Sequence, residues 1–306
     1  MTSMVEMASV LFCSKRFKVK ASKLYQRLLL PVVLIMGVAL NFGQSASATV
    51  LKIDENVTIS GPLIQGGLIL GVAPAGSTIQ INKKAVRQSP DGHFAFGFGR
   101  DEPKSATLSI KLPDGEQLSK KLTIAPQNYK IQRVEGVPQR TVTPDPKDLE
   151  RIQKEAAAIK KARATNSDLT HFKEGFSWPL LGPITGVYGS QRVYNGEPKR
   201  PHFGLDIAAP TGTPVKATAD GVVTLTHPDM FYSGGTILID HGYGISTTFI
   251  HLSKVIAKEG QYVKRGEVVA EVGQSGRSTG PHLDWRINWF DVKLDPALIM
   301  PEMPAH

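Results

Sequence analysis

The feature that most restricts the fold is a series of short β-type runs in residues 171–300 with little chain between them. Runs at 221–225, 236–240, 245–249 and 268–272 are rich in β-branched residues and are separated by glycine-containing turns. These connections are too short for the helical crossovers that parallel strands need. We therefore predict an antiparallel, curled β-sheet for this half of a mainly β protein.

A second set of alternating runs occupies residues 49–135. The runs at 57–60, 78–81 and 106–110 are separated by turn signals such as Pro90-Asp91-Gly92. This pattern is typical of a small antiparallel β-sandwich. It contains no catalytic constellation, because His93 stands alone beside a turn, and we interpret it as an accessory module for spacing or docking.

Residues 136–170 form the predicted helical linker between these two parts. From Asp145 to about Arg163 the composition changes to Lys, Glu, Ala, Leu and Ile, with apolar residues such as Leu149 and Ile152 at spacings of three and four. We predict an amphipathic connecting helix here. Its charged side is interpreted as a solvated face.

Residues 1–48 have the parts of a secretory signal peptide. Six Lys and Arg residues between 15 and 27 precede an apolar run at 28–40 and the small-residue site Ala46-Ser47-Ala48. We expect cleavage after Ala48 and export to a bacterial periplasm. The alternative is an uncleaved anchor, through which the leader would associate with the inner membrane.

The net charge of +9 does not indicate a nucleic-acid partner, because much of it belongs to this leader. The remaining 30 basic and 26 acidic residues give only +4. The single cysteine, Cys13, would leave with the leader, so the mature chain must be stable without disulfides.

Candidate metal ligands begin at residue 282. If residues 282–285 form a strand after Gly280-Pro281, His282 and Asp284 share one face and Leu283 and Trp285 share the other. One imidazole and one carboxylate rarely suffice to hold a transition metal, so further ligands are needed.

The chain offers them upstream. His202 and Asp206 form an H-x-x-x-D pair, and His251 adds an imidazole. Pro201 and Gly204 oppose a helix around this pair, which favours a loop running into a strand.

These motifs resemble the lysostaphin-type (LytM, M23) zinc metallopeptidase domain. The resemblance covers residues 176–296, roughly two-fifths of the chain, and includes HFGLDIA at 202–208, DHGYG at 240–244, IHL at 250–252 and TGPHL at 279–283. Residues 49–170 resemble the accessory part of periplasmic members on weaker grounds. The resemblance predicts the fold of the C-terminal half and a single Zn²⁺.

The resemblance also implies roles for individual residues. His202 and Asp206 would be metal ligands, and His251 and His282 would assist catalysis. One of these two histidines would accept a proton from the metal-activated water, and the other would stabilise the oxyanion or protonate the leaving amine. The third ligand of the family is a histidine at the position that is Asp284 here.

This departure bears on activity. An aspartate can bind zinc at about 2.0–2.2 Å, but a second carboxylate makes the site formally neutral and its water a weaker acid. A carboxylate of Asp284 that turned away, or that was salt-bridged to an arginine instead, would overturn the peptidase interpretation and leave a non-catalytic relative. Phe249 is a milder departure, since relatives often carry a tyrosine whose hydroxyl would then be missing here.

Other polar residues receive weaker interpretations. Arg192, Arg286 and Asn288 are candidates for a groove wall, although arginines beside a cleft are more often plain surface charge. We interpret His241, which precedes a glycine turn, as a structural hydrogen-bonding residue. His171 and His227 receive no role.

The function expected from these features is that of an exported zinc metalloendopeptidase that cuts peptide stems or cross-links of peptidoglycan. The alternative is a non-catalytic relative that regulates a cell-wall hydrolase partner or binds peptidoglycan without cutting it. Stoichiometric zinc separates the two.

Overall fold

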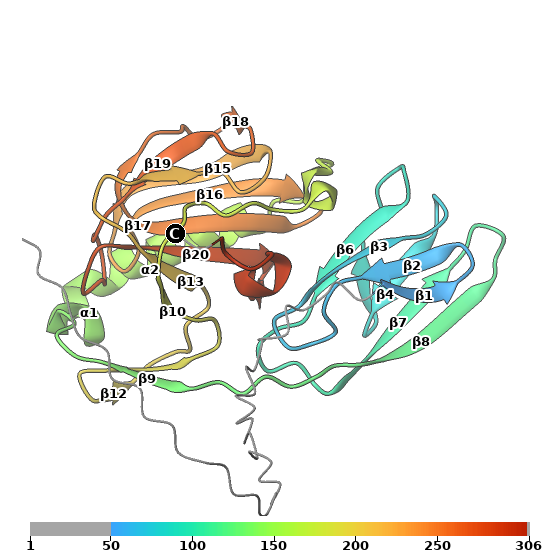
Figure 1. The fold of residues 1–306 in the computed structure, drawn as a ribbon, viewed down its shortest axis with the longest axis horizontal. Coiled ribbons are helices and arrows are strands. Elements are labelled where there is room, and N and C mark those ends of the chain that lie inside the picture. Colours follow the sequence, from blue (N-terminus) through green and yellow to red (C-terminus); the bar gives the residue numbers. More distant parts are fainter. Residues whose placement is uncertain (1–49, 305–306) are drawn as a thin grey trace, which may run out of the picture. The chain divides into compact units, whose positions relative to one another are not determined.

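The computed structural model describes residues 50–304, and its fold is mainly β, as predicted (Figure 1). The predicted signal peptide and Cys13 lie outside these residues. Within them, no helix has both the length and the apolar character that crossing a bilayer requires.

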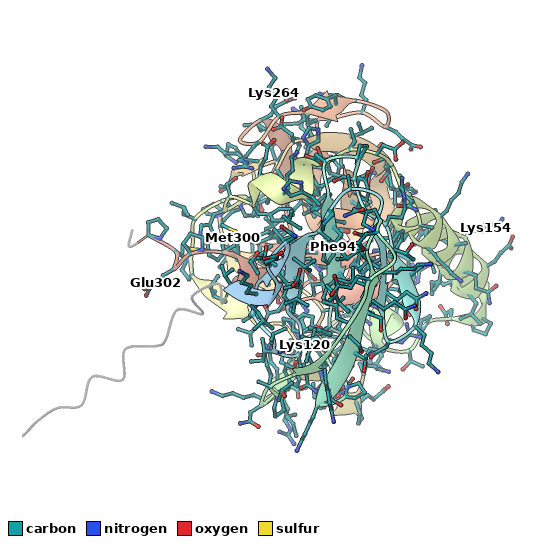
Figure 2. The ribbon with its side chains drawn as sticks, turned by 90° about the vertical axis from the view of Figure 1, so that its right-hand side faces the viewer. Phe94, Lys120, Lys154, Lys264, Met300 and Glu302 are labelled. Carbon is teal, nitrogen blue, oxygen red and sulfur yellow. The ribbon has the colours of Figure 1, made fainter. Side chains whose placement is uncertain are left out.

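The first part consists of two four-stranded antiparallel sheets, as expected for a β-sandwich. One sheet has the order β1 (Val50–Asp54), β2 (Val57–Ser60), β3 (Leu68–Val72) and β6 (His93–Gly97). The other has the order β5 (Lys84–Val86), β4 (Thr78–Ile81), β7 (Ser105–Lys111) and β8 (Gln117–Thr123). Alternate residues of these strands are buried in an apolar core, where Phe94 is fully buried, whereas lysines such as Lys120 project outward (Figure 2).

The predicted linker contains the helices α1 (Gln139–Val142) and α2 (Pro146–Arg163). Helix α2 matches the predicted helix, with a proline in its first turn and basic residues in its last turn. The linker is preceded by β9 (Ile131–Val134) and followed by the 3₁₀ turn η1 (His171–Glu174). Strand β9 was predicted as part of the sandwich, but it pairs in parallel with β11 (Gln191–Tyr194) of the second half, whose other neighbour is β12 (Glu197–Pro198).

A ten-stranded antiparallel sheet dominates the second half. Its main path has the order β10-β13-β20-β17-β16-β15-β18, with β14, β19 and β21 joined beside it. The strands are β10 (Ile184–Gly186), β13 (Leu205–Ala208), β14 (Pro214–Lys216), β15 (Gly221–Met230), β16 (Gly234–Gly242), β17 (Ile245–Val255), β18 (Tyr262–Val263), β19 (Val268–Val272), β20 (His282–Trp289) and β21 (Val292–Leu294). A last 3₁₀ turn, η2 (Pro296–Ile299), follows them.

The core of this sheet lies at its three central strands. Phe249 of β17 is in register with Trp285 of β20 on one side and with Ile237 of β16 on the other, and all three are fully buried. A hydroxyl on residue 249 would therefore lie in the apolar core. The phenylalanine at this position fits the core, and its difference from relatives that carry tyrosine does not bear on the polar site.

Replacing Phe249 tests how much this core contributes. Phe249→Ala should lower the free energy of unfolding by about 3–5 kcal/mol, because the substitution removes a buried aromatic ring and leaves a cavity. Val72→Ala in β3, where the side chain is 40% exposed, should change it by less than about 0.5 kcal/mol. Urea denaturation measures both values, and equal effects would contradict the assignment of Phe249 to the core.

Candidate metal centre

Strands β13 and β20 place two carboxylates directly opposite each other. Asp206 is paired in register with Asp284, whereas Leu283 and Trp285 are fully buried on the other face. The predicted alternation along 282–285 is therefore confirmed, and so is the loop that leads into the strand before Asp206. Like charges opposite each other in a sheet are unfavourable, so cations are needed nearby.

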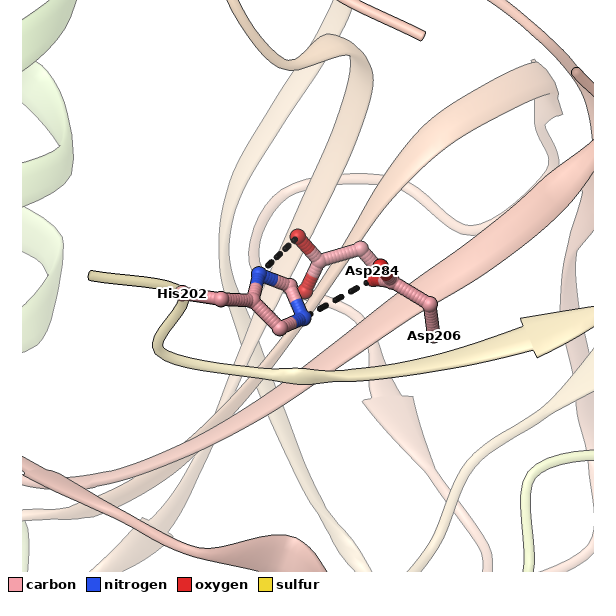
Figure 3. Close-up of side chains that lie close together, drawn as sticks. All are labelled: His202, Asp206 and Asp284. Carbon is pink, nitrogen blue, oxygen red and sulfur yellow. Dashed lines mark ion pairs between the residues drawn. The ribbon is translucent and has the colours of Figure 1, made fainter. Parts of the chain in front are cut away.

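His202, in the loop before β13, completes a group of three (Figure 3). Ligand atoms of His202, Asp206 and Asp284 lie within 4.8 Å of one another, and all three residues are buried. Nε2 of His202 is 3.0 Å from Oδ1 of Asp206, and Nδ1 of the same ring is 4.0 Å from Oδ2 of Asp284.

Two atoms of this group suit a metal ion particularly well. His202 Nε2 and Asp206 Oδ1 are buried and have no hydrogen-bond partner among the described residues. Buried polar atoms are rarely left without a partner, and an imidazole nitrogen facing a carboxylate oxygen is a suitable pair of zinc ligands. The residues present therefore fit a divalent metal held by His202 and Asp206, with Asp284 beside them.

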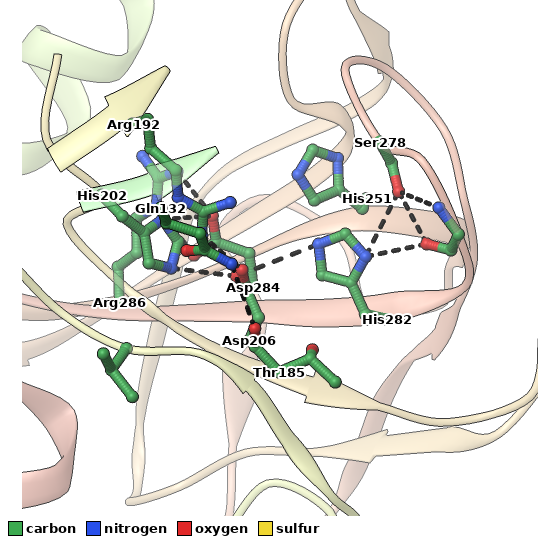
Figure 4. Close-up of polar contacts among 12 residues, drawn as sticks. Gln132, Thr185, Arg192, His202, Asp206, His251, Ser278, His282, Asp284 and Arg286 are labelled. Atoms are coloured by element: carbon green, nitrogen blue, oxygen red, sulfur yellow. Dashed lines mark hydrogen bonds and ion pairs between the residues drawn. The ribbon is translucent and has the colours of Figure 1, made fainter. Parts of the chain in front are cut away.

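Two arginines neutralise the carboxylates (Figure 4). Nη2 of Arg192 donates to Oδ2 of Asp206 at 2.7 Å, and both side chains are less than a tenth exposed. Nε and Nη2 of Arg286 donate to Oδ1 and Oδ2 of Asp284 at 2.9 and 2.6 Å. The interpretation of these arginines as plain surface charge is therefore wrong.

Of the two conditions that point to a non-catalytic protein, one is met, because the carboxylate of Asp284 is salt-bridged to Arg286. The other is not met, because this carboxylate still lies close to His202 and Asp206. Burial alone would raise the pKa of both carboxyl groups. At Asp284 the guanidinium of Arg286 outweighs burial and holds the pKa of the carboxyl group below its ordinary value. At Asp206 the ring of His202, and after it Arg192, lower the pKa in the same way.

His251 and His282 lie beside the three ligand candidates. Their ring centroids are 4.9 Å apart, and Nε2 of His282 is 3.9 Å from Oδ1 of Asp206. His251 has a φ of +66°, which is unusual for a residue with a side chain, and the strand register shifts on either side of it. Regular alternation would place His251 on the core face with Phe249, so this irregularity explains why it faces the site.

Backbone carbonyls hold both rings in one tautomer. Nδ1 of His251 donates to the carbonyl of Ser275 at 2.8 Å, and Nδ1 of His282 donates to the carbonyl of Gly280 at 2.8 Å. In a neutral ring the other nitrogen, Nε2, is then free to accept a proton. Burial lowers the pKa of His251 to about 4, which keeps this ring neutral at pH 7.

The loop that carries these carbonyls is in contact with the linker. Arg277 lies over the rings of Tyr194 and Tyr232 and donates to the backbone oxygen of Thr141 in α1 at 3.3 Å. Four of the five site residues are buried, and the side chain of His282 is 17% exposed.

His241, His171 and His227 lie apart from the site. His241 is fully buried between the carbonyl of Asp220 and the hydroxyl of Thr247, which confirms its structural role. His171 contacts the Tyr262 hydroxyl, and the His227 ring accepts from the backbone N–H of Asp229. Neither belongs to the metal-type group found in residues 50–304.

Comparison with known proteins locates this centre in a family. Residues 200–296 match the model of peptidase family M23. Peptidoglycan DD-endopeptidase ShyA of Vibrio cholerae is 46% identical over 89 residues, which are 28% of this chain and 20% of that protein. DD-carboxypeptidase/endopeptidase Mpg of Neisseria meningitidis is 47% identical over 107 residues, or 34% of this chain and 24% of that protein. The chain thus spans about a quarter or less of the length of these relatives.

A solved structure extends the similarity beyond the matched region. The structure of a putative peptidase M23 from Pseudomonas aeruginosa has a TM-score of 0.60 and 28% sequence identity, covering 77% of this chain and 94% of that chain. An antiparallel sheet holding two aspartates and three histidines together defines a metallopeptidase-type centre. The chain contains a peptidase family M23 domain, as the motifs predicted.

Gly204 offers a test of the site's packing. A Cβ at this position would lie 2.1 Å from Oδ1 of Asp284 and 2.9 Å from Cγ of Arg286. Gly204→Ala should therefore displace the carboxylate, lower the free energy of unfolding by about 1–3 kcal/mol and weaken zinc binding roughly tenfold or more. Gly99→Ala is the control, because its Cβ would meet nothing closer than 3.8 Å. Unchanged zinc affinity in Gly204→Ala would contradict this geometry.

Buried neutral histidines should make stability depend on pH. Burial lowers the pKa of His241 from 6.5 to about 4, so between these values the unfolded chain binds a proton that the folded chain does not. This contribution is complete above pH 6.5 and is lost as the pH falls to about 4, by at most roughly 3 kcal/mol. Urea denaturation at pH 7 and 4.5 should show a smaller pH effect in His241→Gln than in wild type. Equal effects would refute this assignment.

Proposed function

We propose that this chain is an exported, zinc-dependent endopeptidase that hydrolyses peptide bonds in the stems or cross-links of peptidoglycan. The observation that carries this proposal is the convergence of His202, Asp206 and Asp284 on one buried point with His251 and His282 beside it, inside an M23 domain. The names of the curated relatives, which include peptidoglycan DD-endopeptidases, support the substrate class.

The site residues divide the chemistry among them. Zinc, when bound, supplies a Lewis acid that polarises the scissile carbonyl and lowers the pKa of water. His202 and Asp206 would hold the ion through their partnerless atoms, and Asp284 would be the third ligand. The Nε2 atom of His251 or His282 is free to accept the proton of the attacking water, and the other ring then stabilises the oxyanion or protonates the leaving amine.

Export to the periplasm is part of the same proposal. The basic segment, the apolar run and the Ala46-Ser47-Ala48 site support it, and peptidoglycan lies on the outer side of the inner membrane. An uncleaved leader would instead keep the chain on that membrane near the same substrate.

A non-catalytic role is the second candidate, and the bidentate salt bridge between Asp284 and Arg286 favours it. In that case the domain would bind peptidoglycan peptides or regulate a cell-wall hydrolase without retaining zinc. The zinc content of the purified chain distinguishes the two, because the peptidase retains one ion per chain.

Digestion of cell-wall sacculi tests the catalytic proposal. The chain without residues 1–48 should release peptide fragments, a chelator should stop the release, and added zinc should restore it. His282→Ala should lower the rate by about 10²- to 10⁴-fold, because it removes a proton-transfer group. His227→Ala is the matched control and should retain the wild-type rate.

The contrary outcome is equally specific. Sacculi that bind wild type and His282→Ala alike, with no peptide released by either, would establish the binding role. Full activity of His282→Ala would show that the catalytic histidine has been assigned wrongly.

A further inference from the structure

Two arginines contact the two site carboxylates in different ways. Arg192 uses one nitrogen to bind Oδ2 of Asp206, which leaves Oδ1 without a hydrogen bond and 3.0 Å from His202 Nε2. A hydrogen bond to the outer oxygen of a carboxylate orients the inner oxygen toward a metal. Arg192 thus supports the ligand role of Asp206.

Arg286 engages Asp284 through both oxygens. Its Nε and Nη2 donate to Oδ1 and Oδ2 at 2.9 and 2.6 Å, which is the two-pronged pairing that guanidinium and carboxylate groups form most strongly. The two residues are two apart on β20, so both side chains emerge from the same face of the sheet. Each oxygen of the carboxylate that would be the third ligand already accepts a hydrogen bond from a guanidinium.

The surroundings are built to keep this pair together. The missing Cβ of Gly204 leaves the space that Oδ1 of Asp284 and Cγ of Arg286 occupy. Asp284 is 1% exposed, and breaking a buried ion pair by removing one partner is strongly unfavourable. With Arg192 on Asp206 and Arg286 on Asp284, two negative and two positive charges balance before any metal is present.

We propose that Arg286 is an internal counter-cation that competes with the metal ion for Asp284. In the metal-free chain it neutralises the third ligand position and stabilises the folded site. When a divalent ion binds to His202 and Asp206, the charge of Arg286 and its two hydrogen bonds to Asp284 oppose the third coordination bond. The inference rests on the metal site of the proposed function. It predicts that Arg286 lowers the affinity of this chain for its metal ion.

Zinc affinities of three glutamine variants test the competition. Competition with a chromophoric chelator should give Arg286→Gln an affinity roughly 10- to 100-fold higher than wild type, because the competing charge is gone. Arg192→Gln should bind zinc more weakly, because Asp206 loses its orienting donor. Arg265→Gln is the control and should bind zinc like wild type, because its guanidinium donates to the carbonyls of Glu174 and Gly175, which are not part of the site.

Thermal unfolding provides a second readout that does not depend on activity. Exhaustive chelation should lower the melting temperature of wild type only slightly, since Arg286 stabilises the site when no metal is bound. Arg286→Gln should melt at a lower temperature without metal and gain more from added zinc than wild type does, because a ligand that binds only the folded state stabilises it in proportion to its affinity.

A double-mutant cycle links the two positions directly. Asp284→His alone leaves a partly buried guanidinium without its partner and should lower the melting temperature. Adding Arg286→Gln should recover stability and give zinc affinity above that of wild type. Independent, additive effects at the two positions would overturn the proposal.

The outcomes separate this inference from the proposed function. Zinc binding by wild type that is as tight as binding by Arg286→Gln would overturn the counter-cation role and leave the peptidase proposal standing. Absence of zinc binding in wild type and every variant would overturn both.

Discussion

The structure of the site depends on one cross-strand pair, Asp206 opposite Asp284. Two carboxylates so close together and so deeply buried repel each other and lose most of their hydration. Several neighbouring residues offset this cost. His202, Arg192 and Arg286 bring positive charge or hydrogen-bond donors, and two glycines leave room, since a Cβ on Gly186 or Gly204 would lie 2.0 or 2.1 Å from a carboxylate oxygen.

Irregular backbone geometry and a loop position the rings of His251 and His282. The left-handed φ of His251 rotates its ring out of the core and toward His282. The loop between β19 and β20 then supplies a carbonyl to each imidazole from Ser275 and Gly280, which selects the tautomer in both rings. A single loop thus orients both proton-transfer candidates, and Arg277 in the same loop joins it to the linker through Thr141.

The burial of the site is related to the balance of charges within it. Arginines that neutralise the carboxylates also allow the site to be buried, because uncompensated charges are costly to remove from water. Under the proposal for Arg286, the same balance opposes a divalent cation at the third ligand position.

Much of this protein could be predicted from local patterns. Short β runs with short connections predicted the antiparallel sheet, and residue alternation predicted which faces of 282–285 meet the core. The resemblance of the motifs to the M23 family pointed to His202, Asp206, His251 and His282. These features are local, since they depend on strand period, turn chemistry and the order of motifs along the chain.

Only the tertiary structure showed that Arg192 and Arg286 pair with the two carboxylates, that His251 leaves the core face through a positive φ, and that β9 joins β11 in parallel. The sequence does not show whether the long side chain of an arginine extends into solvent or pairs with a buried carboxylate. The folded chain decides this, because a carboxylate that folding removes from water needs a nearby cation. For Asp284, the neighbouring arginine therefore determines how available its oxygens are to a metal.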